Sequence, residues 1–301
     1  MIRTRPFAAG AAALVLLVTL AGCGGDDGGD DEAAESSTTA AVVAGETSPD
    51  VTVAPIQAPE LSDETRARVD AALAAGGAYL GDRLDEVGTS SLAFLDYVWR
   101  RWAVEGIEDA RTVAAGAVEP DDPSEALMLR LVRPEAEPPE RAEGRDGTFW
   151  EHDVLVAALH CDQRAVPDDY TATLGREIAG RAYAASHVAY AIQWTRELGC
   201  VVPGIDEVAD AVIATLAAVL DAEPVVADDS LGVAAALGYL GRPDLVPAAF
   251  LDAVLTAQHD DGGWGLAADE PNSDWHPSGL AVWVLAAATG EGADEPMIVT
   301  D

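Results

Sequence analysis

The sequence predicts an all-α protein whose helices pack in two layers, and three features of the chain support this. From Leu61 onward, stretches of helical length follow one another between glycine and proline breaks, and no stretch alternates apolar and polar residues as a half-buried strand would. Two stretches, 231–240 and 280–288, are apolar on every side, so we expect them to be buried all round. Neighbouring stretches such as 205–222 are apolar on one side only. This alternation predicts inner, buried helices covered by outer, amphipathic ones.

The expected helices are bounded by residues that start or stop helices. Ser62 is expected to cap the first helix, because a serine hydroxyl accepts a hydrogen bond from a free amide of the first turn. Asp63 and Glu64 follow it, where the helix dipole favours acids. Glycine or proline separates most of the later helices. The expected helices span 62–84, 89–104, 106–118, 123–133, 152–161, 168–183, 185–198, 205–222, 228–241, 245–258 and 277–289.

Successive helices pair into a repeating unit. Each unit joins an amphipathic helix to the apolar helix that follows it, and small residues such as Ser186 and Ser278 come at the start of the apolar helix. The units lie near 62–104, 168–198, 205–241 and 245–289, with a poorly matched fifth within 106–161. The period of about forty residues is typical of helical repeats. We therefore expect about five repeats.

Residues 1–22 show the order of features found in an export signal. Arg3 and Arg5 precede an apolar run at 7–20, which is too short to span a membrane comfortably. The run ends in Leu-Ala-Gly-Cys, which resembles the lipobox of bacterial lipoproteins, with Cys23 as the acylated first residue of the mature chain. The resemblance implies a lipid anchor, with palmitate among its acyl chains, on the extracytoplasmic face of the cell membrane. The alternative is an ordinary signal peptide with an incidental cysteine.

Residues 23–60 are expected to form a disordered tether. Glycine and aspartate dominate its first part, and serine, threonine, alanine, valine and proline dominate the rest. Such a composition buries too little apolar surface to offset the entropy of the chain. The tether carries acids and no base, so anionic headgroups repel it. Residues 61–301 then form the folded domain.

The chain is strongly acidic, with 17 basic residues, all arginine, against 53 acidic ones and a net charge of −36. A surface of this sign cannot neutralise phosphates, which argues against nucleic acid as a partner and against a polybasic membrane patch. Two explanations stay open for the excess of acids. A cationic partner is one, and adaptation to high salt or a GC-rich genome is the other. The acids are spread along the chain, which favours the second explanation.

Two cysteines remain beyond the proposed lipidation site, Cys161 and Cys200. An even number of cysteines in an exported domain predicts a disulfide between them. The alternative is two free, buried thiols.

The last helix pair carries a recognisable motif. It consists of Phe250, Gln258, Gly262, Gly263 and Trp264. This pattern resembles the QW motif of the squalene–hopene cyclase and protein prenyltransferase superfamily, over residues 250–289. The resemblance implies an α/α toroid, a closed ring of paired helices with a hollow middle. In this motif Gln258 would satisfy backbone groups at a helix end, the glycines would make a tight turn, and Trp264 would pack over it.

The activities of that superfamily are not implied, because their chemical motifs are missing. The Asp-x-Asp-Asp acid motif of the cyclases, the Asp-x-Cys zinc element of the prenyltransferases and the Cys-x-Glu-Gln segment of thioester toroids are absent from the sequence. We therefore expect no cofactor.

In a toroid, the starts of the inner helices line one mouth of the central cavity. Histidines, acids and aromatic residues gather near these starts: Trp150, His152, Asp153, His187, Tyr190, Asp228, Asp229, Asp274, Trp275 and His276. We expect these residues to form a pocket for a small lipid or glycan. The same residue types could also supply a general acid and base, or a histidine–carboxylate metal site. The sequence identifies no individual metal ligand. The alternative is that the acids cap helices and the tryptophans fill the core.

The expected function is the binding or scaffolding of a small ligand by a lipid-anchored protein of the cell envelope. The alternative is an enzyme, a lyase, hydrolase or isomerase that acts on a polyisoprenoid or glycan in the cavity. A third alternative, a structural spacer, would show a cavity filled by side chains.

Overall fold

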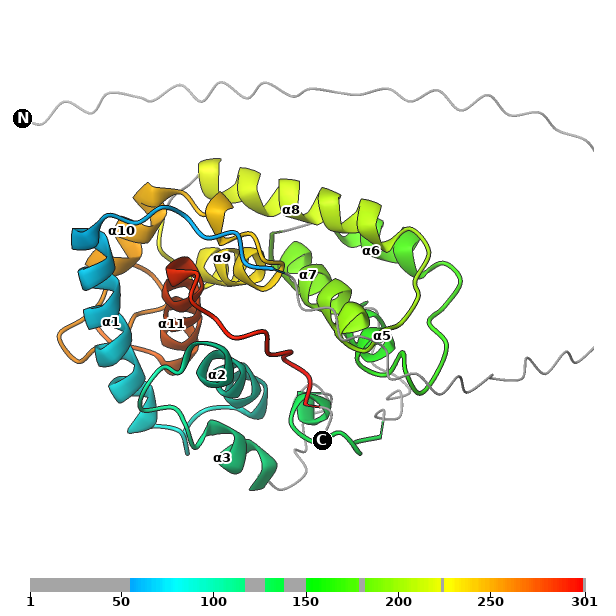
Figure 1. Cartoon of the computed structure of the whole chain (residues 1–301), viewed down its shortest axis with the longest axis horizontal. Helices are drawn as coiled ribbons and strands as arrows, with labels where there is room; N and C mark the ends of the chain where they lie inside the picture. The colour runs from blue at the N-terminus through cyan, green and yellow to red at the C-terminus, as the bar shows by residue number, and fades with distance from the viewer. Residues whose placement is uncertain (1–54, 117–127, 138–149, 179–181, 223–224, 300–301) are drawn as a thin grey trace, which may run out of the picture. The chain divides into compact units, whose positions relative to one another are not determined.

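The computed structural model describes residues 55–116, 128–137, 150–178, 182–222 and 225–299, without the side chains of 150–153 (Figure 1). This part of the chain is helical and contains no strand beyond the isolated bridges Ala227–Ala267 and Trp264–Asp274, which confirms the all-α prediction. The helices are α1 (Asp63–Gly81), α2 (Thr89–Trp102), α3 (Ala110–Gly116), η1 (Leu129–Leu131), α5 (Trp150–Leu159), α6 (Tyr170–Ile178), α7 (Ala182–Glu197), α8 (Ile205–Ala222), α9 (Asp228–Tyr239), η2 (Pro243–Leu245), α10 (Ala248–Thr256) and α11 (Trp275–Thr289).

The helices form an inner and an outer layer (Figure 1). The inner helices contact one another in the order α2, α11, α9, α7 and α5. The outer helices pack on them: α3 on α2, α1 on α11, α8 on α9 and α7, and α6 on α7, while α10 packs on α1. Along α11, side chains on every side are buried, as the apolar sequence requires.

Four inner helices, α2, α7, α9 and α11, run in the same direction. At one end of the layer, Asp228 at the start of α9 contacts His276 at the start of α11. At the other end, Tyr239 at the end of α9 contacts Glu197 at the end of α7, and the amide of residue 293, just after α11, bonds to Arg101 near the end of α2. We call these the amino end and the carboxyl end of the inner layer.

The last helix begins earlier than the sequence suggested. It starts at Trp275, two residues before Pro277, which was expected to be its boundary. Asp274 caps it by accepting a hydrogen bond from the amide of His276. A proline fits the third position of a helix because the amides of the first turn have no carbonyl partner within the helix. Of the expected helix 123–133, residues 128–133 are described, and they contain the short 3-10 turn η1.

The QW-like motif ties the loop after α10 to α1. The side-chain amide of Gln258 donates to the carbonyl oxygens of Ala72 and Gly262, both at 2.9 Å. Trp264 is fully buried, and its indole nitrogen donates to the carbonyl of Val254 at 2.8 Å. A side chain at Gly76 of α1 would come within 2.9 Å of the Trp264 ring, so α1 passes close over it. Gln258 thus satisfies backbone carbonyls as expected, but one of them lies in the middle of α1 and not at a helix end.

The turn inside the motif needs glycine. Gly262 has φ of +90°, a conformation that side chains disfavour, and a Cβ there would lie 2.5 Å from the carbonyl oxygen of Ala75. Phe250, the first residue of the motif, is fully buried in α10.

Cys161 and Cys200 form the predicted disulfide, with their Cα atoms 6.1 Å apart. The bond joins the segment after α5 to the segment after α7.

The export signal, Cys23 and most of the tether lie outside the described residues. The end of the tether, residues 55–60, runs along the domain: the amide of Gln57 donates to the carbonyl of Gly241, and its carbonyl accepts from the amide of Asp244, both at 2.9 Å. Chain packed against the helices therefore begins before Leu61.

Candidate functional site

A histidine–carboxylate pair marks the amino end of the inner layer. Nδ1 of His276 lies 2.6 Å from Oδ1 of Asp228, although the two residues are 48 positions apart. The side chains are 42% and 32% exposed, so both are reachable from solvent. Two adjacent inner helices position the pair, since Asp228 is the first residue of α9 and His276 the second of α11.

The pair favours a charged imidazole. The hydrogen bond to Asp228 raises the pKa of His276 above its usual value; burial opposes the shift, and the charges of Asp228 and Asp274 add to it. Because Nδ1 is held by Asp228, Nε2 is the ring nitrogen that would meet a ligand.

Aromatic groups of α7 belong to the same end. The His187 ring lies 4.2 Å from the ring of Tyr183 and 5.8 Å from that of Tyr190, measured between centroids. Nδ1 of His187 is 2.8 Å from the carbonyl oxygen of Tyr183. The pKa of Tyr190 is raised by burial and, less strongly, by the charges of Tyr183 and Asp228, which places Asp228 close to this aromatic group.

Exposed apolar side chains lie at the same end of the inner layer. Tyr183, Val225 and Leu266 are 42%, 59% and 45% exposed. The amide of Asp228 donates to the carbonyl of Leu266 at 3.0 Å, which holds the loop of Leu266 beside the start of α9. We call the surface formed by Tyr183, His187, Val225, Asp228, Leu266 and His276 the amino-end face. It combines exposed apolar side chains with hydrogen-bond donors and acceptors, as ligand sites do.

The structure brings together part of the predicted pocket. Asp228, Asp274, Trp275 and His276 adjoin one another, and the Trp275 and His276 rings lie 5.6 Å apart. His187 adjoins Tyr190 on α7. Asp229 is exposed in the first turn of α9. The side chains of Trp150, His152 and Asp153 lie outside the described residues.

No metal site was found among the described residues, where no three side chains of histidine, cysteine, aspartate or glutamate lie suitably close.

Aromatic side chains occupy the middle of the inner layer. They come from α2, α7, α9 and α11, and neighbouring rings lie between 5.4 and 6.2 Å apart: Phe94, Tyr97, Tyr190, Trp194, Tyr239 and Trp283. All but Phe94 are buried, with exposures of 5% or less. The sequence predicted a hollow middle. In the structure, these aromatic rings fill the middle of the inner layer.

The carboxyl end contains a buried polar cluster that the sequence did not predict. Glu197 is 2% exposed, and its carboxylate accepts hydrogen bonds from the hydroxyl of Tyr239 at 2.8 Å and from the amides of Met297 and Ile298 at 2.9 and 3.1 Å. Burial raises the pKa of Glu197 to about 7, against the effect of these hydrogen bonds. Glu197 follows Thr195 and Arg196 at the end of α7, so no local pattern in the sequence set it apart.

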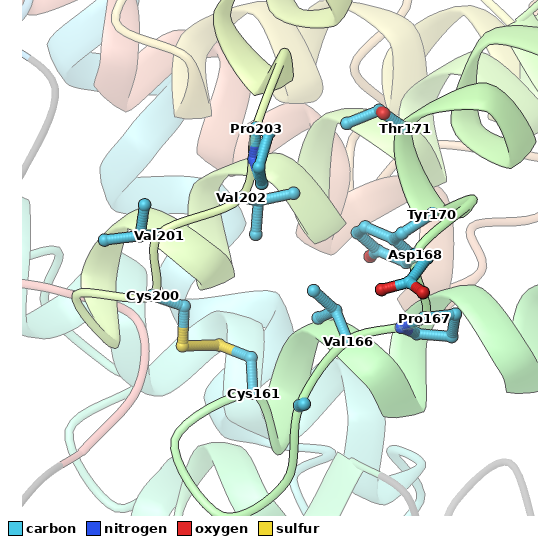
Figure 2. A pocket seen from close by; sticks show the side chains of 11 residues that line it. Cys161, Val166, Pro167, Asp168, Tyr170, Thr171, Cys200, Val201, Val202 and Pro203 are labelled. Atoms are coloured by element: carbon cyan, nitrogen blue, oxygen red, sulfur yellow. A yellow bond between two sulfur atoms is a disulfide. The ribbon is translucent and has the colours of Figure 1, made fainter. Parts of the chain in front are cut away.

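Two surface pockets lie elsewhere. One, of about 370 Å³, is formed beside the disulfide, with Val166, Pro167 and Val202 among its apolar walls and Asp168 at its rim (Figure 2). The other, of about 520 Å³, is an open depression at the turn of the QW-like motif, lined by Gln258, the three residues after it and Pro271. Neither contains residues of the amino-end face.

Comparisons with protein-family models, with curated proteins and with solved structures give no match to this chain. Among the described residues, no helix has the length and apolar character needed to cross a membrane.

Proposed function

We propose that this protein is a lipid-anchored binding protein of the cell envelope, and that it recognises a glycan at the amino-end face. The anchoring rests on the lipobox-like ending at Cys23, and the acidic tether gives the domain reach from the membrane. The observation that carries the binding function is the contact of 2.6 Å between His276 and Asp228, at an end of the inner layer that also has exposed apolar side chains.

We further propose that the domain is an α/α toroid whose middle is filled by aromatic side chains instead of being hollow. Among the described helices, outer and inner ones alternate from α1 to α11. The inner helices α5, α7 and α9 each contact the next inner helix along the chain, and α11 contacts α2. Five outer–inner pairs would make the ring, with the η1 segment and the residues after α11 between α2 and α5. The QW-like turn supports this arrangement, because it joins the last outer helix to the first through Gln258 and Ala72.

The chemistry of the face favours a glycan over a lipid. A sugar ring can stack its apolar side on an exposed aromatic ring such as Tyr183, while its hydroxyls bond to a carboxylate and an imidazole. A lipid chain would need a deep apolar cavity, and at the level of Tyr190 the middle of the inner layer is filled by rings.

Binding to soluble envelope glycan fragments, measured by calorimetry, tests this function. Tyr183→Ala and Leu266→Ser are expected to weaken binding at least tenfold. Val201→Ser is the matched control, because Val201 is 92% exposed but lies in the segment beyond the carboxyl end of α7. Equal affinities for all of these variants would place binding elsewhere and overturn the proposal.

The second candidate is an enzyme acting on the same glycan, and the His276–Asp228 pair favours it. The carboxylate would orient the imidazole and stabilise its charged form, so that Nε2 acts as a general acid or base. His276→Gln would then abolish turnover of glycan fragments, whereas their binding would weaken only by the loss of the hydrogen bond to the imidazole. Absence of any turnover by the wild-type protein would leave binding as the function.

A further inference from the structure

The residues after α11 cross the carboxyl end of the inner layer as an extended segment. We call residues 291–299 the tail; it runs from the end of α11 past α2 (Figure 1), and the amide of Val299 donates to the carbonyl of Leu131 in η1 at 3.1 Å. Its last part, Met297 to Val299, is buried, with exposures of 1%, 0% and 8%. The preceding residues are half-buried or exposed and contain Gly292, so they form a linker.

The domain holds the tail mainly through its backbone. Glu197 accepts from the amides of Met297 and Ile298, at 2.9 and 3.1 Å. The guanidinium of Arg100 donates to the carbonyls of Pro296 and Met297, at 2.6 and 3.0 Å. Contacts of this kind recognise an extended peptide largely independently of its sequence, as grooves that bind peptides do.

The side chains of the tail contribute apolar contacts. Met297 Sδ accepts from the indole nitrogen of Trp194 at 3.4 Å, and Ile298 is fully buried. Recognition therefore combines backbone hydrogen bonds with room for two large apolar side chains in succession.

The tail leaves polar atoms of the groove without partners. Oδ1 of Asp96 and Nε1 of Trp102 are buried and make no hydrogen bond to any described residue. Asp96 adjoins the tail through Arg100, to which its other oxygen bonds at 2.8 Å, and a Cβ at Gly292 would lie 2.8 Å from Nε1 of Trp102. Buried polar atoms are usually satisfied, so these two are available to a peptide with groups that the tail lacks.

We propose that the carboxyl end of the inner layer is a peptide-binding groove which the tail occupies in cis, and that its partner is an extended peptide segment with two consecutive large apolar residues. The partner peptide would displace Met297 and Ile298, bond to Glu197 and Arg100 through its backbone, and reach Asp96 and Trp102. This second site is independent of the amino-end face.

The test uses the full chain with a protease site inserted between Asp294 and Glu295, where the linker is exposed or half-buried. The probe is a fluorescent peptide with the sequence of residues 295–301, and its anisotropy reports binding. After cleavage, the tail can dissociate and be replaced by the probe, so the cut chain is expected to bind the probe. The uncut chain is the matched control: a tethered tail has an effective concentration of the order of millimolar, so for a probe Kd of about 10 µM it should bind about 100-fold more weakly.

Competition with unlabelled peptides tests whether the probe binds in the groove. An unlabelled peptide of the same sequence should displace the probe, and one carrying Met297→Asp and Ile298→Asp should not. The proposal is overturned if the cut chain keeps its own tail and takes up no probe, if it loses its helical circular dichroism on cleavage, or if cut and uncut chains bind the probe equally. The first two results would make the tail an integral part of the core, and the third would place binding outside the groove.

Discussion

Replacing Glu197 by alanine tests the buried cluster at the carboxyl end of the inner layer. The substitution removes the acceptor of the hydrogen bonds from the Tyr239 hydroxyl, from the amides of Met297 and Ile298 and from the side chain of Gln193. Each of these donors would stay buried without a partner, at a cost of about 1–3 kcal/mol each. We expect a loss of about 4 kcal/mol in the free energy of unfolding, a large part of the stability of a typical domain.

The measurement is urea denaturation at pH 6, followed by tryptophan fluorescence, because Trp194 contacts Met297. Asp210→Ala is the control: Asp210 is exposed on α8, and its replacement should change the free energy of unfolding by no more than about 0.5 kcal/mol. If Glu197→Ala cost less than about 1 kcal/mol, the tail would not be held by the carboxylate, and the assignment of the cluster would be wrong.

The pH dependence of stability gives an independent test. Since the pKa of Glu197 is raised to about 7 in the folded protein, its stabilising contribution is complete below its ordinary pKa and is lost as the pH rises through about 7. The wild-type protein should therefore lose stability between pH 5 and pH 8, by about 3 kcal/mol from this group. Glu197→Gln carries no titrating group, so this part of the slope should vanish; an unchanged slope would contradict the raised pKa.

Four further predictions concern other parts of the chain. Cys23→Ser should release the protein from membranes into the medium, and a mature protein of unmodified mass from wild-type cells would refute the anchor. Replacing both Cys161 and Cys200 by serine should lower the free energy of unfolding by up to about 4 kcal/mol, since the bond closes a loop with a sequence separation of 39; an unchanged urea midpoint would contradict this. Trp264→Ala should cost about 3–5 kcal/mol by the same assay, because the side chain is fully buried against α1. Asp228→Asn should lower the pKa of its histidine partner, measured by NMR titration, and an unshifted titration would show that the hydrogen bond does not form in solution.

The candidate site was predictable in part. Asp228, Asp274 and His276 come together because each lies at the start of an apolar helix, and such helices must be inner ones. Asp274 caps α11, and its charge also helps to raise the pKa of His276. Tyr183, Val225 and Leu266 were not predicted, because single exposed apolar residues leave no periodic pattern in a sequence.

Local patterns in the sequence determined the class, the order and most boundaries of the helices. Apolar periodicity, prolines and caps act within one or two turns: Ser62 caps α1 by accepting from the amide of Thr65 at 3.1 Å, as expected. Short-range patterns do not specify which residues far apart in the sequence contact one another. Only the tertiary structure decided those contacts. Glu197 binds amides 100 and 101 positions away, and aromatic rings from four helices fill the middle of the layer. Such contacts depend on how all the helices pack together, so no short stretch of sequence specifies them.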